Sequence, residues 1–380
     1  MTVRIERRLT QPHWLKVAVP AGSLVVAFFL IAIVLLATGH DPAATYRDLF
    51  EAAFTAPGAL TQTLIGATPL IFTGLAAAAA FRMNLFNIGG EGQLYFGTIG
   101  ASAAGLLLAG HSAPVLIVAM IVAGFASGAA WALIPGFLRA YLSTNEIITS
   151  LMLNYVAGLF LTYLIFDSHS YWRDTTSASA AVFPIGKVLP DAANWPTFGS
   201  SVVIPFGFLL GVVAATLLWV LYSRTRFGFE VQVMSDSPRA ARYSGMRTRR
   251  KILAVMALSG GLAGLGGASQ VGDFLHTLDA DPKGLRAYGY GYTGIVVAAL
   301  ARYNPFAVVL IAFLLGGLQN AGAALQGPDF PSGLVGVMEG MILFTALGGE
   351  LLVRYRVRFA RRRPVVAAAE PKTPASEAAR

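Results

Sequence analysis

The sequence predicts an all-α polytopic membrane protein with about ten transmembrane helices, and three observations support this. Of the 380 residues, 56% are hydrophobic and only 12% are charged, whereas soluble domains carry about 25% charged residues. The apolar residues form long runs separated by short polar segments. Glycine is frequent, with 41 residues, as expected where helices pack closely within lipid.

The net charge of +9 invites the interpretation that the chain binds nucleic acid. The position of the basic residues argues against this, because they lie in short segments between apolar runs, where they set membrane topology. The chain has no cysteine, which excludes disulfides and thiol chemistry and leaves the compartment open. The first apolar run is too long for a signal-peptide core, so we expect it to remain as a helix.

Five spans are expected in the first half of the chain. A basic segment, residues 1–16, precedes the first span, and a short polar segment, residues 39–57, follows it. A polar island rich in Asn and Gly separates the second span from the third. We expect these five spans at residues 17–38, 59–81, 93–110, 114–138 and 146–166.

Five further spans are expected after a long polar segment, residues 167–200, which is rich in Pro, Ser and Asp. The most basic internal loop, residues 223–251, follows the sixth span. The tail, residues 354–380, begins basic and ends rich in Pro, Ala and Glu, so we expect it to be disordered. The membrane domain then covers residues 17–353, with the later spans at 201–222, 252–271, 288–301, 305–325 and 333–353.

Ten spans place both termini on the same side of the membrane. If that side is the cytoplasm, 23 Lys and Arg residues lie inside and 5 lie outside. An excess of Lys and Arg is typical of cytoplasmic loops. We therefore expect segment 1–16, loop 223–251 and tail 354–380 in the cytoplasm, and segment 167–200 on the other side.

A weak internal echo indicates an inverted repeat that relates spans two to five to spans seven to ten. Gly74–Ala76 precedes the polar island, and the similar Gly261–Ala263 precedes Tyr288–Gly291. The two halves run in opposite senses, and inverted repeats place a substrate path at their interface. In a chain so rich in glycine such a match also arises by chance, so the repeat remains a hypothesis.

The polar island contains the sequence FNIGGEGQ, residues 86–93. Irregular backbone at membrane depth persists only where it is buried in protein or faces a water-filled cavity. The island could line a path, with Asn87, Glu91 and Gln93 offering hydrogen bonds, or it could break a helix so that two subunits pack closely. The structural alternative is a cytoplasmic turn after Arg82, with Glu91 favoured near a helix N-terminus by the helix dipole.

A polar stripe is expected on the fifth span, in the sequence STNEIITSLMLNY. Glu146, Ser150 and Asn154 recur at four-residue intervals and therefore share one helix face, with Asn145 beside them. Ser143 and Glu146 also have the spacing of a capping box. That box would explain Glu146 but not Asn154, which lies two turns further into an apolar helix, so we expect the stripe to face inward.

Glu339 lies inside the tenth expected span. An ionisable residue at membrane depth is a functional candidate by default. The structural alternative is a carboxylate near the outer interface that is hydrogen-bonded to Gln319 or Asn320 of span nine.

The sequence SDSPRAARYSG predicts a short helix within the basic loop. Ser237 suits the N-cap, Pro238 the first helical position and Gly245 the stop. Such a helix could dock on a partner, although basic loops are often only solvated and near lipid. The chain has no phosphate-binding loop, metal-ligand cluster or nucleophile with its base, so we expect no bound cofactor, no metal and no ATP hydrolysis by this chain.

Three motifs, FNIGGEGQLYFG, NEIITSLMLNY and SPRAARYSGM, together resemble the permease subunit of bacterial ABC importers for nucleosides, in the ribose and branched-chain amino-acid permease group. The resemblance covers roughly residues 60–350. It implies a multi-pass permease in the bacterial inner membrane, a partner ATPase that uses ATP and Mg²⁺, a second and different permease subunit, and an extracytoplasmic substrate-binding lipoprotein. It also assigns ATPase coupling to Ser237, Pro238, Arg239, Ala240, Ala241, Arg242, Tyr243 and Gly245.

The residues expected along the solute path are Asn87, Glu91, Gln93, Asn145, Glu146, Ser150, Asn154 and Glu339. Most are neutral donors and acceptors, which suit hydroxyls and base edges, whereas a carboxylate or phosphate calls for Arg or Lys. A simple sugar such as ribose fits equally well, so the choice of a nucleoside rests on the resemblance. A further alternative is an ion-coupled secondary transporter with Glu91 or Glu339 relaying protons, which would not need a docking helix.

Overall fold

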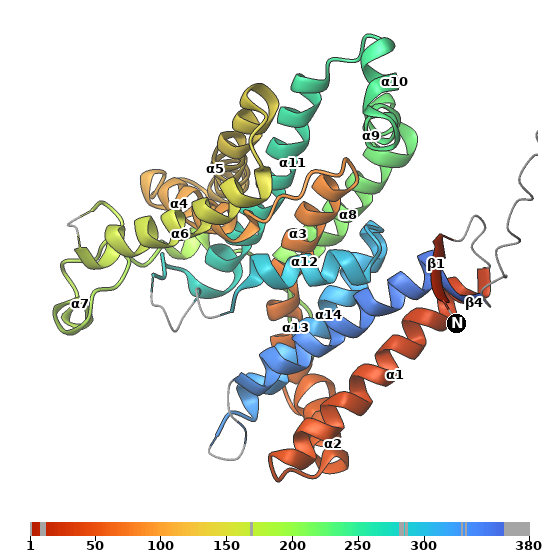
Figure 1. Ribbon diagram of the computed structural model, residues 1–380. Helices are drawn as coiled ribbons and strands as arrows, with labels where there is room; N and C mark the ends of the chain where they lie inside the picture. Colours follow the sequence, from red (N-terminus) through yellow and green to blue (C-terminus); the bar gives the residue numbers. More distant parts are fainter. Residues whose placement is uncertain are drawn as a thin grey trace, which may run out of the picture.

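The computed structural model describes residues 2–7, 13–167, 170–280, 285, 288–327, 330 and 333–360. Its regular structure is almost entirely helical (Figure 1). The α-helices are α1 (His13–Ala37), α2 (Pro42–Phe50), α3 (Ala59–Phe81), α4 (Gly90–Leu107), α5 (Ala113–Leu142), α6 (Glu146–Thr162), α7 (Ala178–Val182), α8 (Phe206–Arg224), α9 (Arg226–Asp236), α10 (Pro238–Tyr243), α11 (Thr248–Ser269), α12 (Tyr290–Leu300), α13 (Pro305–Ala324) and α14 (Gly333–Arg354).

Shorter elements extend or connect these helices. The π-helical turns are η1 (Glu51–Thr55), η2 (Tyr163–Asp167) and η4 (Gln270–Leu275), and a 3₁₀ turn is η3 (Asp191–Ala193). Two small antiparallel pairs join β1 (Thr2–Arg7) to β4 (Tyr355–Ala360) and β2 (Thr197–Phe198) to β3 (Ile204–Pro205).

Each of the ten expected spans falls on a helix, namely α1, α3, α4, α5, α6, α8, α11, α12, α13 and α14. Within the described ranges, six helices are long and apolar enough to cross a membrane. The helices α1 and α2, the second continued by η1, are bent by 117° at their junction. If they form one broken span, they add a seventh crossing. The chain is therefore mostly helical with six or seven clear candidate spans, and the number ten stays a prediction.

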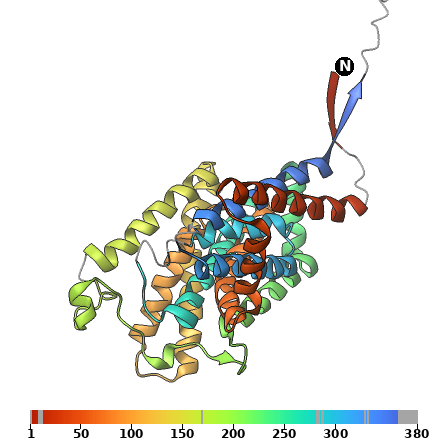
Figure 2. The ribbon, with the colours of Figure 1, turned by 90° about the horizontal axis from the view of Figure 1, so that it is seen from below.

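The two ends of the described chain lie together. Strands β1 and β4 pair from Thr2 with Ala360 to Arg7 with Tyr355, and Figure 2 shows them side by side, projecting from the helices. This agrees with an even number of crossings, whereas the cytoplasmic location stays a prediction. The tail was expected to be disordered from residue 354, but residues 355–360 form β4, and residues 361–380 lie outside the described part.

Helix α3 forms the centre of the bundle. It contacts α8, α11, α12 and α13, and Leu70, Ile71 and Phe72 are fully buried. A helix that is apolar on all sides is buried on all sides. In the polar island that follows its C-terminal end, Asn87, Glu91 and Gln93 are buried, whereas Phe86 is exposed.

The described part of the long polar segment, residues 170–200, packs over the end of α11. The backbone N–H of Trp195 donates to Gly272 O at 2.9 Å, and that of Leu189 donates to His276 O at 2.9 Å. Asp273 Oδ2 accepts the backbone N–H of Gly207 at 3.0 Å, which caps the start of α8. The sixth helix begins at Phe206 rather than at the expected residue 201, because the residues just before it form β3, which pairs with β2.

Candidate solute path and coupling surface

Asn87 and Gln93 form a buried amide pair in the polar island. Asn87 Nδ2 donates to Gln93 Oε1, and Gln93 Nε2 donates back to Asn87 Oδ1, both at 2.9 Å. Asn87 Nδ2 also donates to Ser259 Oγ of α11 at 2.9 Å. The exposed fractions of Asn87 and Gln93 are only 3% and 1%, and this mutual bonding lets both amides remain in the interior.

The polar stripe of α6 binds the backbone of the island. Ser150 Oγ accepts the N–H of Ile88 at 3.1 Å. Asn154 Oδ1 accepts the N–H of Gly92 at 2.9 Å, and its Nδ2 donates to Ile88 O at 2.8 Å. Ser150 and Asn154 are buried, so the expectation that the stripe faces inward is confirmed.

The expected capping box at the start of α6 is wrong. Helix α5 continues to Leu142, so Ser143, with φ of 55°, terminates α5 instead of capping α6. Asn145 is the N-cap, and its Oδ1 accepts the N–H of Ile147 at 2.9 Å. Asn145 is exposed and separate from the buried cluster. Glu146 instead forms an ion pair with Arg139, with Nε and Oε2 3.2 Å apart.

Glu91 joins the first turns of two short helices. It lies in the first turn of α4, and its Oε2 accepts the backbone N–H of Gly291, in the first turn of α12, at 2.6 Å. Its Oε1 accepts the hydroxyl of Tyr95 at 2.6 Å. Helix N-termini favour nearby negative charge, so two helix starts stabilise this carboxylate. Only glycine fits at 291, because a Cβ there would overlap the backbone of Glu91.

The first helix of each expected repeat contacts the polar segment of the other. In α3, Thr73 Oγ1 donates to Tyr290 O at the start of α12, at 2.9 Å. In α11, Ser259 Oγ accepts from Asn87 of the island. This crossed arrangement supports the inverted repeat, which stays a prediction.

In each half of the chain, a polar side chain also bonds to the first turn of a short helix. That side chain comes from the helix two spans further along the sequence. Asn154 of α6 accepts from Gly92 in α4. In the corresponding place, Glu339 of α14 accepts from Thr293 Oγ1 in α12, at 3.4 Å. The contacts of Asn154 and Glu339 are therefore similar in the two halves, which agrees with the predicted repeat.

Glu339 is hydrogen-bonded to the helix of span nine, as its structural alternative expects. Gln319 Nε2 donates to Glu339 Oε1 at 3.0 Å. Asn320, the other candidate donor, instead donates from Nδ2 to the carbonyl oxygens of Ala52 and Ala59, each at 3.2 Å. Both hydrogen-bond partners of the Glu339 side chain therefore come from α12 and α13.

Sequence reasoning missed four residues of this arrangement. Ser259 and Asp273 carried a detectable signal, because each is a polar residue in an apolar segment. Asn84 belongs to the polar island rich in Asn and Gly, and Tyr292, whose hydroxyl lies 3.3 Å from Asn154 Nδ2, carried no such signal. Their partners are 151 and 138 residues away in the sequence.

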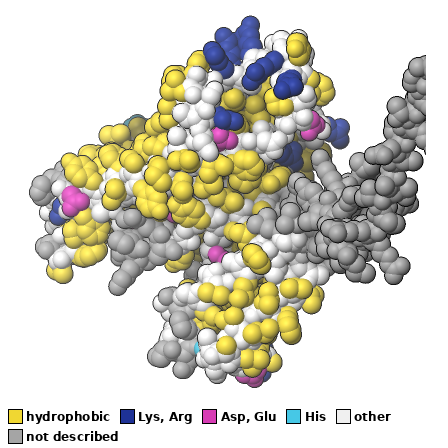
Figure 3. Space-filling view, in the orientation of Figure 1, with side chains coloured by type: hydrophobic (Ala, Val, Ile, Leu, Met, Phe, Trp, Pro, Cys, Tyr) yellow, Lys and Arg dark blue, Asp and Glu magenta, His cyan; other side chains and the backbone are white. Residues whose placement is uncertain are grey.

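The short helix in the basic loop has the expected limits. Ser237 is the N-cap of α10, with its Oγ 3.4 Å from the N–H of Ala240, and Pro238 is the first residue. Gly245 follows with φ of 73°. Ala241 is fully buried, whereas Tyr243 is 94% exposed. Figure 3 shows Lys and Arg side chains gathered at the end of the molecule where α9 and α10 lie in Figure 1.

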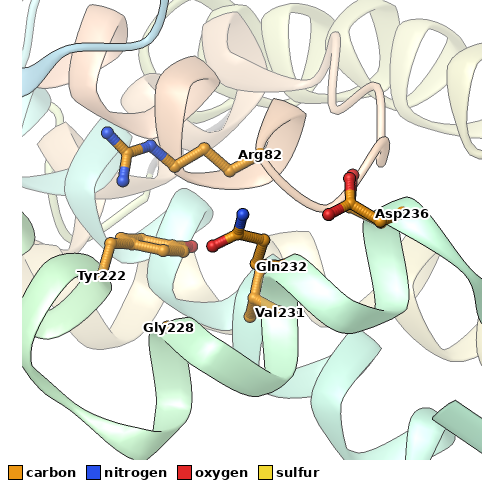
Figure 4. A pocket seen from close by; sticks show the side chains of 7 residues that line it. Arg82, Tyr222, Gly228, Val231, Gln232 and Asp236 are labelled. Atoms are coloured by element: carbon orange, nitrogen blue, oxygen red, sulfur yellow. The ribbon is translucent and has the colours of Figure 1, made fainter.

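A pocket of about 240 Å³ lies between α9 and the ends of α3 and α8 (Figure 4). The Arg82 guanidinium lies 5.0 Å from the centre of the Tyr222 ring, and its Nη2 donates to Tyr303 O at 2.9 Å. Helix α9 is therefore incompletely packed against the bundle on this side. The residues lining the pocket are Arg82, Tyr222, Gly228, Val231, Gln232, Ser235 and Asp236.

Two polar contacts hold α9 in place. Lys251 Nζ lies 2.7 Å from Glu230 Oε2, and this hydrogen bond, with a weaker contribution from Arg226, holds the pKa of the Glu230 carboxyl below its ordinary value. Asn84 Nδ2 donates to Ser235 Oγ at 2.8 Å and to Ser235 O at 3.2 Å. The second contact connects α9 directly to the loop that leads into the polar island.

The apolar helices and the buried polar helix starts define a multi-pass membrane protein of the transport class. The family described as "Branched-chain amino acid transport system / permease component" matches residues 59–347, and the chain belongs to that family. It is the permease component of an ABC transporter, and the resemblance expected from its motifs is confirmed.

Three relatives are similar over most of their length. The guanosine ABC transporter permease protein NupP of Bacillus subtilis is 32% identical over 90% of this chain and 94% of its own. The nucleoside ABC transporter permease protein NupB of Lactococcus lactis is 30% identical over 87% and 90%. The glucose ABC transporter permease protein TsgB13 of Haloferax volcanii is 31% identical over 94% of both chains.

Proposed function

We propose that this chain is the permease subunit of an ABC importer that moves nucleosides across the bacterial inner membrane. The observation that carries the proposal is the similarity to relatives named for guanosine and for nucleosides over about nine-tenths of both chains. The buried cluster agrees with this solute class, because amides and hydroxyls suit sugar hydroxyls and base edges.

The solute path is proposed to run along Asn87, Glu91, Gln93, Asn145, Glu146, Ser150, Asn154 and Glu339. In the described conformation the island side chains bond to one another and to backbone. They can therefore contact a solute only after α4 and α6 move apart. Asn145, which caps α6 at its exposed end, would contact the solute only at the end of such a path.

A simple sugar is the second candidate solute. The similarity to TsgB13, which is named for glucose, extends over 94% of both chains. The hydroxyls of a sugar suit the same neutral groups. The ion-coupled alternative is disfavoured, because the three relatives are all named as ABC transporter permeases.

The proposed assembly contains an ATP-binding subunit that uses ATP and Mg²⁺, a second and different permease, and an extracytoplasmic binding lipoprotein. Its support is the family membership and the short helix α10 at the basic end, which presents an exposed Arg239, Ala240 and Tyr243. The basic end, with both termini, is proposed to lie in the cytoplasm, and segment 167–200 outside.

Uptake in cells with and without the gene tests the solute. Labelled guanosine, uridine, glucose and ribose are each supplied to the wild-type strain, to the deletion strain and to the complemented strain. We expect nucleoside uptake to fall in the deletion strain and to return on complementation, while sugar uptake is unchanged. A fall in glucose or ribose uptake alone would transfer the assignment to the sugar class.

A further inference from the structure

The region around α10 is joined to the rest of the bundle by few contacts. Within the described chain, α10 packs mainly on α9. The C-terminal turn of α9 is held by Asn84, which donates to both the Oγ and the carbonyl oxygen of Ser235. Ser235 lies two residues before Ser237, the N-cap of α10. The Asn84–Ser235 bond therefore lies at the junction of α9 with α10.

Asn84 belongs to the loop 82–89, which several other elements also hold. Its φ of 53° is left-handed, a conformation that asparagine adopts more readily than most other residues. Two residues earlier, Arg82 donates to the carbonyl oxygen of Tyr303 between α12 and α13. Two residues later, the N–H of Phe86 donates to Glu146 at the start of α6, at 3.4 Å. The loop thus connects α9 with two further parts of the bundle.

The same loop ends at the start of α4. Five residues separate Asn84 from Gly90, and the N–H of Ile88 is fixed by Ser150. A displacement of Asn84 therefore reaches the first turn of α4 over a short, tethered segment. From there Glu91 contacts Gly291 of α12, which brings the second half of the protein into the same network.

We propose that Asn84 is a positioning residue that carries a displacement of α9 and α10 to the start of α4 through its bond to Ser235. The proposal rests on the proposed function, in which an ATPase docks on α10. The pocket between Arg82, Gln232 and Ser235 leaves this side of α9 incompletely packed (Figure 4). Val231 and Met234 pack the other side of α9 into the core, so the hydrogen bond is a polar connection from its C-terminal turn to the loop 82–89.

The test compares transport with ATP hydrolysis in the complete complex, reconstituted in proteoliposomes. Asn84→Gly keeps the left-handed backbone accessible and deletes only the side-chain bonds. Because one such bond contributes about 1 kcal/mol, we expect guanosine taken up per ATP hydrolysed to fall about fivefold to tenfold, while ATP hydrolysis persists. Thr216→Ala is the matched control, since it deletes an exposed bond within α8, from Thr216 Oγ1 to Val212 O at 3.0 Å.

A cross-link provides the rescue. The chain has no cysteine, so Asn84→Cys with Ser235→Cys creates a single reactive pair in it. We expect this double variant to be uncoupled when reduced and to regain the wild-type ratio when a short thiol-reactive linker joins the two residues. The proposal is overturned if Asn84→Gly keeps the wild-type ratio, or if the linker leaves the ratio low or blocks uptake.

Failure of the nucleoside assignment is distinguishable from failure of this link. If the wild-type complex takes up glucose and not guanosine, the nucleoside assignment fails, and the same ratio measured with glucose still tests Asn84.

Discussion

Glu91 is a carboxylate buried at the point where two helices begin, and local hydrogen bonds explain its burial. It is 3% exposed, and both oxygens accept short bonds, one from the Gly291 backbone and one from Tyr95. A buried charge without such compensation would be strongly unfavourable. The same contacts make Glu91 the direct connection between α4 and α12.

We expect Glu91→Gln to destabilise the protein by about 2 kcal/mol, because a hydrogen bond to a charged group contributes about 1.5–3 kcal/mol. Glutamine keeps the shape of the side chain but loses the charge that the two helix starts favour. The midpoint of thermal unfolding of the detergent-purified chain measures the effect. Glu51→Gln, at an exposed position in η1, is the control, and equal shifts for both variants would contradict the role of Glu91.

At the scale of elements, α5 and α11 approach closely through glycine. A Cβ at Gly264 of α11 would overlap the carbonyl oxygen of Gly124 in α5 and crowd the Cα of Gly128. Small residues at such contacts let helix backbones pack closely within lipid. This packing positions α11, and with it Ser259, against the polar island.

We expect Gly264→Ala to lower stability by about 1–3 kcal/mol, the usual effect of overpacking. A backbone atom is the obstacle, so side-chain rearrangement alone does not relieve it. Gly340→Ala in α14 is the matched control, because a Cβ there meets nothing within 4 Å. Thermal unfolding of the two variants side by side decides the point, and a stable Gly264→Ala protein would mean that the two helices separate readily.

Helix α10 is the element proposed to contact the ATPase, and Tyr243 is its most exposed apolar residue. We expect Tyr243→Glu to abolish co-purification of the ATPase while the chain remains folded in the membrane, because a charge replaces an aromatic contact. Val182→Glu in α7 is the control, since Val182 is similarly exposed, at 88%, at a position expected on the opposite face. Retention of the ATPase by the Tyr243 variant would remove α10 from the interface.

For the whole molecule, the expected topology puts segment 167–200 and the basic loop on opposite sides of the membrane. The chain has no cysteine of its own, so Ser177→Cys and Arg239→Cys each create one reactive site, and both positions are exposed. We expect an impermeant thiol reagent to label residue 177 in intact cells and residue 239 only after lysis. Labelling of both from outside would overturn the topology.

Local patterns were sufficient where a feature depends on neighbouring residues. The cap at Ser237 and the stop at Gly245 are short-range features, and both are present in α10. The four-residue spacing of Ser150 and Asn154 correctly predicted their shared, buried face. The capping box at Ser143 was wrong, because the length of α5 rather than the local motif decided which residue begins α6.

The sequence by itself therefore determined the helical, multi-pass class, the position of each apolar helix within a few residues and the resemblance to nucleoside importer permeases. Only the tertiary structure decided which polar groups meet. Glu91 bonds to a residue 200 positions away, and Asn84 to one 151 positions away. Such pairs follow from how closely the helices pack, and packing depends on the shapes of many side chains at once rather than on any local pattern.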